Sequence, residues 1–204
     1  MNQAKQKLRE KIWHLLETTQ AADFPLPCYG RIPNFKGVQR ATEKLLEWQP
    51  FKDAKCVFSA PDYVLRRARE LVLVMEKQLI VATPHMRAFL MLENVPVAKI
   101  KEAVTIKGFH RFGKKLDEEV LKGVIDIFLQ GSVAVDMQGN RLGKGKGYGD
   151  KEYWFLACKG LLSSDCQVVS IVHDLQVVEN FSALVSPEDV KVNCILTPTR
   201  MILV

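Results

Sequence analysis

The spacing of hydrophobic and polar positions predicts several helices. From Leu8 to Leu16 the apolar residues recur at helical intervals, with charged residues between them, which predicts an amphipathic helix over residues 5–17. Prolines and glycines then interrupt any regular pattern, so we expect a long loop over residues 23–37. The same helical periodicity predicts further helices over residues 38–48, 63–75 and 153–162.

Short apolar runs predict the strands of a sheet. We expect strands at residues 56–59, 79–82, 168–172 and 192–196, and a longer apolar stretch at 125–135 that Gly131 interrupts. The first two runs flank the helix at 63–75, an order typical of parallel strands joined by a crossover helix. No repeat or interdomain linker divides the 204 residues. The pattern therefore predicts one α/β domain over residues 1–204, with a mostly parallel sheet.

Composition places the chain among ordinary globular proteins. Hydrophobic residues make up 48% and charged residues 25% of the sequence, which gives no sign of disorder. No apolar run reaches the roughly 18 residues that cross a bilayer, and the charged start is no secretory signal, so we expect no membrane insertion. Five scattered cysteines without a C-x-x-C pair indicate a reducing, cytoplasmic location.

The net charge of +6 favours anionic partners, such as a nucleotide, a polyglutamylated cofactor or a nucleic acid. Many basic residues lie between Lys99 and Lys122, where we expect solvated loop and helix surfaces. Arg66, Arg67 and Arg69 are likewise interpreted as solvated helix positions. Because a nucleic-acid surface needs aromatic residues among its cations, and few occur here, we do not expect this chain alone to bind nucleic acid.

The segment from Gly139 to Asp150 carries the clearest chemical signal, and it lies between a predicted strand and a predicted helix. Its glycines occupy every second position, at Gly143, Gly145, Gly147 and Gly149. Glycines let the backbone approach a phosphate closely, so that successive N–H groups converge on the anion. Three cations accompany them, Arg141, Lys144 and Lys146. The composition equally fits a mobile surface loop, because this is not the G-x-x-x-x-G-K-[ST] pattern.

Two further residues of this segment have alternative interpretations. Asp150 is a candidate Mg²⁺ ligand, since Mg²⁺ needs only one or two protein carboxylates beside phosphate and water. It is equally placed to be the N-cap of the following helix. Tyr148 is either a functional hydroxyl inside the loop or a ring that packs against that helix.

The segment ending at Asp150 resembles the signature of the 5-formyltetrahydrofolate cyclo-ligase (methenyltetrahydrofolate synthetase) family, whose loop binds ATP, folate and magnesium. Lys5 and Arg9 resemble the family's other ATP-binding element, a lysine followed four residues later by an arginine. Residues 188–192 resemble the segment that holds the second magnesium ligand, here Asp189. Residues 31–37, 171–174 and 195–200 resemble the methenyltetrahydrofolate synthetase domain-containing subgroup.

The resemblance implies a three-layer αβα fold of the NagB, ribose-phosphate-isomerase and CoA-transferase kind. It also implies ATP- and Mg²⁺-dependent cyclisation of 5-formyltetrahydrofolate to 5,10-methenyltetrahydrofolate. The implied catalytic residues are Arg141, Lys144 and Tyr148. The implied ATP-binding residues are Lys5, Arg9, Arg141, Leu142, Gly143, Lys144, Gly145, Lys146, Gly147, Tyr148 and Gly149. The implied metal ligands are Asp150 and Asp189.

Two positions depart from the family pattern. Gly149 stands where cyclo-ligases place a second tyrosine before the loop aspartate. The pterin-anchoring glutamate has no equivalent, since its position falls near Val64, with Asp62 as a weak substitute. These departures keep open the alternative of a nucleotide-binding relative without folate turnover, and the net positive charge keeps open an RNA-associated protein. Some members of the subgroup carry an RNA-binding domain, and we expect none within this chain.

Other conspicuous residues have ordinary structural interpretations. His173 and Asp174 follow an apolar strand, where α/β sites gather, but the histidines show no paired ligand spacing. We therefore interpret His173 as a hydrogen-bonded structural residue. Residues 163–165 lack the glycines of a nucleophile elbow and are interpreted as a turn that ends a helix. We expect Trp13, Trp48 and Trp154 to lie in the core or on a helix face.

Overall fold

A computed structural model of the chain describes residues 3–116 and 124–204. Within these residues the main sheet has eight strands in the order β13-β12-β10-β7-β3-β4-β5-β6. The bounds are β3 (Cys56–Ser59), β4 (Gln78–Ala82), β5 (Phe89–Leu92), β6 (Lys114–Lys115), β7 (Ile125–Leu129), β10 (Leu162–Ile171), β12 (Cys194–Leu196) and β13 (Met201–Leu203). The central strands β12, β10, β7, β3 and β4 pair in parallel, and antiparallel strands flank them on both sides.

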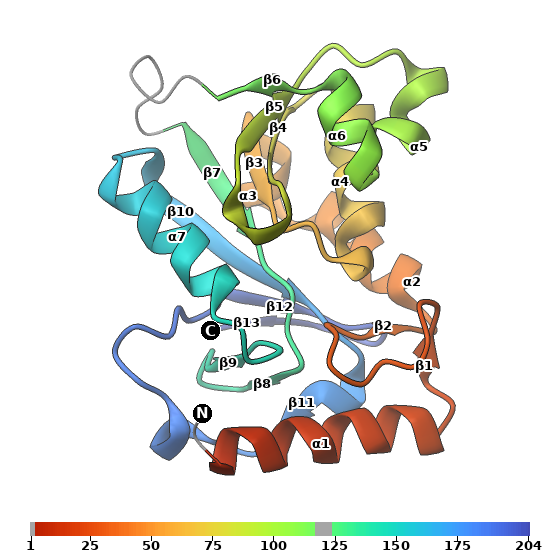
Figure 1. Cartoon of the computed structure of the whole chain (residues 1–204), viewed down its shortest axis with the longest axis vertical. Helices are drawn as coiled ribbons and strands as arrows, with labels where there is room; N and C mark the ends of the chain where they lie inside the picture. The colour runs from red at the N-terminus through yellow and green to blue at the C-terminus, as the bar shows by residue number, and fades with distance from the viewer. Residues whose placement is uncertain (1–2, 117–123) are drawn as a thin grey trace.

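Helices cover both faces of this sheet (Figure 1). The α-helices are α1 (Gln3–Thr18), α2 (Val38–Glu43), α3 (Gln49–Asp53), α4 (Arg66–Val74), α5 (Ile100–Ala103), α6 (Ile106–Phe112) and α7 (Tyr148–Cys158). Successive strand residues point to opposite faces, so Val57 and Ile127 join the core beneath α1, α2 and α4. Phe58 and Phe128 join a second core, which Leu156 of α7 completes. The expected three-layer α/β fold is confirmed.

Two small ladders lie beside the main sheet. They are formed by β1 (Ala22–Asp23) with β2 (Asn34–Phe35), and by β11 (Val177–Val178), β8 (Ala134–Asp136) and β9 (Arg141–Leu142). The turn between β8 and β9 is held by Asp136, whose carboxylate accepts hydrogen bonds from the backbone of Gln138, Asn140 and Phe181. Gly139 takes φ +76°, and a Cβ there would lie 2.5 Å from the Val192 carbonyl oxygen. This turn places Arg141 at the start of β9.

Several sequence predictions agree with these elements. The predicted parallel pair at 56–59 and 79–82 is confirmed, with the helix at 63–75 present as a 3₁₀ turn (Tyr63–Leu65) followed by α4. Trp13 and Trp48 are buried, and Trp154 lies on an exposed helix face. The expected solvated basic surface is exposed at Lys99, Lys101, Lys107, His110, Arg111, Lys114 and Lys115, and Lys122 lies outside the described residues. No helix within 3–116 and 124–204 has the length and apolar character to span a bilayer.

Other predictions were wrong. The helix expected at 153–162 begins at Tyr148 because Gly147, in a left-handed conformation with φ 67°, caps it. Asp150 therefore lies inside the first turn and is not the N-cap. Residues 163–165 are not a turn but part of β10, and the loop at 23–37 contains the β1–β2 ladder. The antiparallel strands were missed because each of them is only two to four residues long.

Arg69 was also wrongly placed on the solvated surface. Its side chain is buried, with the residue 3% exposed, and burial lowers the pKa of its guanidinium to about 10. Nη1 donates to the carbonyl oxygens of Ala60 at 2.8 Å and Asp62 at 3.1 Å. Arg69 thus fixes the segment that follows β3, because its donors satisfy backbone acceptors that no strand pairs.

Candidate functional site

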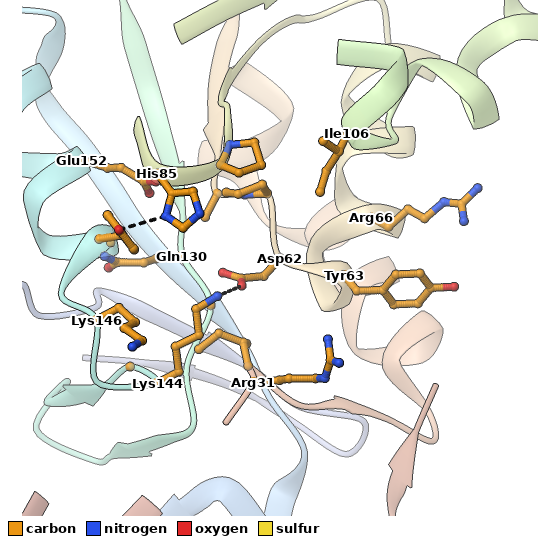
Figure 2. A pocket seen from close by; sticks show the side chains of 18 of the residues that line it. Arg31, Asp62, Tyr63, Arg66, His85, Ile106, Gln130, Lys144, Lys146 and Glu152 are labelled. Atoms are coloured by element: carbon orange, nitrogen blue, oxygen red, sulfur yellow. Dashed lines mark hydrogen bonds and ion pairs between the residues drawn. The ribbon is translucent and has the colours of Figure 1, made fainter. Parts of the chain in front are cut away.

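A cavity of about 860 Å³ opens beyond the carboxyl ends of β3, β4 and β7. Ligands of parallel α/β sheets characteristically bind at this edge. Ala60 to Asp62 follow β3, Thr83 to His85 follow β4, and Gln130 follows β7. Figure 2 shows side chains that line the cavity, among them Arg31, Asp62, Tyr63, Arg66, His85, Ile106, Gln130, Lys144, Lys146 and Glu152.

One wall is the glycine loop, residues 143–147, which joins β9 to α7. Gly145 and Gly147 take φ values of 95° and 67°, a region that favours glycine. The backbone N–H groups of the first turn of α7 have no partner inside the helix, and the helix dipole adds partial positive charge there. The loop and helix terminus together form a geometry suited to a phosphate group.

Two cations of this wall, Arg141 and Lys144, are held by carboxylates. Arg141 forms an ion pair with Asp150, and its Nη1 also donates to the Gly131 carbonyl oxygen at 3.2 Å. Asp150 accepts a further hydrogen bond from the Val190 backbone N–H at 3.0 Å. Across the cavity, the Lys144 ammonium donates to Asp62 at 2.9 Å (Figure 2). The charges of these two cations are therefore compensated by Asp150 and Asp62.

Helix α1 contacts the same loop from outside the cavity. The Arg9 Nε donates to the Gly143 carbonyl oxygen at 2.7 Å, and burial lowers the pKa of Arg9 while the charge of Asp189 opposes this. Lys5 forms an ion pair with Asp189. Burial raises the pKa of Asp189, but hydrogen bonds from Lys5 and Ser186 outweigh it and hold the pKa below its usual range. The structure thus brings Lys5, Arg9, the glycine loop and Asp189 together.

The remaining predicted residues divide into two groups. Tyr148, Gly149 and Lys146 line the cavity, whereas Leu142 is buried and serves as a residue of the β8–β9 ladder. Within 3–116 and 124–204, no three carboxylate, imidazole or thiol groups gather into a metal cluster. Asp150 and Asp189 nonetheless fit Mg²⁺ chemistry, because phosphate oxygens and water supply most ligands of that ion in nucleotide sites. Their metal role stays a prediction.

Sequence reasoning missed two buried polar residues, Gln130 and Glu152. Gln130 is 1% exposed, and neither atom of its side-chain amide has a hydrogen-bond partner among the described residues. Glu152 is 3% exposed, and burial raises its pKa to about 8, with Asp62 adding to the rise and Lys144 opposing it. The one sequence signal was that Gln130 is a polar residue within the apolar stretch at 125–135.

The position of the Gln130 side chain explains why residue 149 is a glycine. A Cβ at position 149 would lie 2.5 Å from the Gln130 Nε2 and 3.2 Å from its Cδ. A tyrosine at 149, as in the family pattern, is therefore incompatible with the observed Gln130 side chain. Gly149 and Gln130 therefore belong together, because the amide that follows β7 lies where a Cβ at position 149 would lie.

His85 and His173 differ in their structural surroundings. His85 lines the cavity, with φ 62°, and its Nδ1 lies 2.9 Å from the Tyr148 hydroxyl. His173 instead caps a short 3₁₀ helix, where its Nδ1 accepts a hydrogen bond from the Leu175 N–H at 3.1 Å. Burial lowers the pKa of His173, against the opposing charge of Asp174. The geometry agrees with the structural interpretation of His173, and His85 is the histidine that sequence reasoning overlooked.

The chain is thus an α/β protein whose cavity lies at the carboxyl ends of the parallel strands, beside a glycine loop with a geometry suited to a phosphate group. The family model for 5-formyltetrahydrofolate cyclo-ligases matches residues 1–198, and the chain belongs to this family. Its similarity therefore extends from the Lys5 helix through the glycine loop to the segment after Asp189.

Curated relatives and solved structures agree with this assignment. The chain is 41% identical over 206 residues to a methenyltetrahydrofolate synthase domain-containing protein of Bos taurus, a match that covers 98% of this chain and 53% of the relative. The corresponding protein of Homo sapiens is 39% identical, with 98% and 53% covered. The chain thus spans about half the length of these relatives.

Two solved structures have the same fold. A 5,10-methenyltetrahydrofolate synthetase of Aquifex aeolicus superposes with a TM-score of 0.60 at 21% identity, covering 98% of this chain and 92% of that one. A 5,10-methenyltetrahydrofolate synthetase of Mycoplasma pneumoniae gives a TM-score of 0.55 at 16% identity, covering 96% and 98%. At these identities the likeness concerns the fold.

Proposed function

We propose that residues 1–204 act as one catalytic domain that uses Mg-ATP to cyclise 5-formyltetrahydrofolate to 5,10-methenyltetrahydrofolate. The observation that carries the proposal is the junction of a phosphate-binding loop with a cavity large enough for a heterocyclic substrate. Family membership supports the same reaction. The five free cysteines support a cytoplasmic location.

The residues have separable roles in this proposal. Lys144, Lys146 and Arg141 neutralise the phosphates from the cavity side, and Lys5 and Arg9 do so from α1. Asp150 and Asp189 are the residues that would hold a magnesium ion, which would supply positive charge to the phosphates. Transfer of the terminal phosphoryl group to the formyl oxygen, followed by attack of N10 and loss of phosphate, needs position and charge neutralisation from the protein. No side-chain nucleophile is required.

Incubation of the folded chain with 5-formyltetrahydrofolate, ATP and magnesium chloride tests this proposal. We expect the strongly absorbing methenyl product to accumulate together with ADP, and omission of magnesium to stop both. Folded protein that releases no methenyl product under these conditions contradicts the proposed reaction.

A second candidate function is nucleotide binding without folate turnover. It is favoured by Gly149, since the family's second tyrosine is missing and a Cβ at this position would meet the Gln130 amide. Calorimetric titration separates the two candidates. ATP binding without measurable 5-formyltetrahydrofolate binding favours the second, whereas ADP release that depends on the folate excludes it.

A further inference from the structure

The side-chain amide of Gln130 is an unsatisfied polar group at the base of the cavity. Gln130 directly follows β7, is 1% exposed, and has no hydrogen-bond partner within the described residues for either Nε2 or Oε1. A buried polar group without a partner destabilises a protein, so such groups are rare and need an explanation. Gly149 makes the room that this amide occupies.

Glu152 presents a second buried polar group to the same cavity. It lies one turn of α7 beyond Tyr148, is 3% exposed, and forms no ion pair or hydrogen bond with another described residue. Its carboxyl group accepts N–H donors in either protonation state. Figure 2 shows Glu152 and Gln130 on the same side of the cavity, beside His85.

The cavity walls around Gln130 and Glu152 suit a ligand with a flat ring. Ile106 points into the cavity from the opposite side (Figure 2), and the cavity lining also includes Ile32, Pro84 and Val104. The rings of His85 and Tyr148 stand at 72° to each other with centroids 5.5 Å apart. Apolar walls with a few convergent polar groups are the usual features of a site for a heterocycle.

The donors and acceptors of the pair restrict the ligand. Phosphates and carboxylates carry acceptors only, so they leave the Gln130 Oε1 without a donor. The hydrogen-bonding edges of adenine offer one exocyclic amino donor beside ring nitrogens that accept. A carboxyl group and an amide together are satisfied by a ring edge that carries several N–H donors next to a carbonyl. The aminopyrimidinone edge of a reduced pterin has this pattern.

We propose that Gln130 and Glu152 recognise the aminopyrimidinone edge of the folate substrate and so replace the missing pterin-anchoring glutamate. This inference rests on the proposed function, since it names the residues that select its substrate. It places the heterocycle on the cavity side of the glycine loop and the nucleotide phosphates toward Lys5 and Arg9, which do not line the cavity.

Two near-isosteric variants test the inference, Gln130→Met and Glu152→Gln. Matched controls make the same replacements at exposed positions, Gln138→Met and Glu179→Gln. For each protein, calorimetry measures the affinity for 5-formyltetrahydrofolate, for ATP, and for 4-aminobenzoyl-glutamate, which lacks the pterin. Thermal unfolding without ligand is recorded in parallel.

We expect each variant to lose about tenfold or more in affinity for 5-formyltetrahydrofolate, as loss of a hydrogen bond to a buried group predicts. ATP and 4-aminobenzoyl-glutamate affinities stay within twofold, and the controls match the wild type. The unfolding midpoint of Gln130→Met equals or exceeds that of the wild type, because an unpartnered amide has been removed. A residue kept for packing alone would show the opposite, a lower midpoint with unchanged folate affinity.

Three results overturn the inference. If the wild type binds 5-formyltetrahydrofolate and both variants bind it equally well, the inference is wrong and the proposed function stands. If the variants lose ATP affinity instead, the pair contacts the nucleobase. If the wild type binds no folate, the proposed function fails, and the inference fails with it.

Discussion

The polar groups that line the cavity differ in how their hydrogen-bonding and charge requirements are satisfied. At the glycine loop, Arg141 and Lys144 are matched by Asp150 and Asp62, so the charges are compensated before any ligand binds. Beside that loop, the Gln130 amide has no hydrogen-bond partner among the described residues, and the buried Glu152 carboxyl group forms no ion pair with them. The first arrangement favours stability and makes binding an exchange of ions. The second arrangement lowers the stability of the folded chain, because its polar groups gain partners only when a ligand binds.

The largest expected effect comes from breaking the buried pair in the loop. Arg141→Ala leaves Asp150 without its guanidinium, and removal of one partner of a buried ion pair costs roughly 3 kcal/mol or more of stability. We expect a loss of this size in urea unfolding, together with weaker ATP binding. The double variant Arg141→Ala/Asp150→Ala should lose less than the two single losses combined. Single variants whose losses simply add would show that the pair is not coupled.

The next largest effect tests the packing of the Gln130 side chain against position 149 of α7. Gly149→Ala places a Cβ 2.5 Å from the Gln130 Nε2, and because this flexible side chain can shift, we expect a loss of about 1 kcal/mol of unfolding free energy, the low end of overpacking costs. Shortening the opposing side chain in Gly149→Ala/Gln130→Ala should restore most of it. Urea denaturation of the three proteins measures both changes. Equal stability of Gly149→Ala and the wild type would contradict the contact.

A smaller effect on stability is expected at the half-exposed cation. Lys144→Met removes the ion pair with Asp62, and partly exposed pairs contribute less than about 1 kcal/mol. ATP affinity should nevertheless fall about tenfold, because a charge-assisted hydrogen bond to phosphate is lost. Lys151→Met, at an exposed position on α7, is the matched control for calorimetry. Equal ATP affinities in the two variants would remove Lys144 from the phosphate site.

The smallest effect is expected at the rim. Tyr148→Phe removes the hydrogen bond to the exposed His85, and water replaces such a partner, so the free energy of unfolding should change by no more than about 0.5 kcal/mol. Chemical denaturation checks this. A loss above about 1 kcal/mol would mean that the pair holds the turn after β4 in place and belongs with the structural contacts of the loop.

Sequence reasoning found the glycines and cations of the loop and missed the buried polar residues Gln130 and Glu152. Glycines and cations at alternate positions are a local signal, readable within residues 139–150. Gln130 and Glu152 carry no such signal, because glutamine after a strand and glutamate in a helix are common on solvated surfaces. Arg69 was misplaced for the same reason, since its partners Ala60 and Val104 lie in separate segments.

The sequence by itself determined the alternation of helices and strands, the parallel centre of the sheet and the glycine-rich, cationic character of the loop at 143–147. Each follows from periodicity or backbone preference over a few neighbouring residues. Only the tertiary structure decided that Arg9 meets Gly143, 134 positions away, that Lys5 meets Asp189, and that Gln130 occupies the space beside Gly149. Such contacts depend on how strands register and helices pack, and local patterns do not encode those distances.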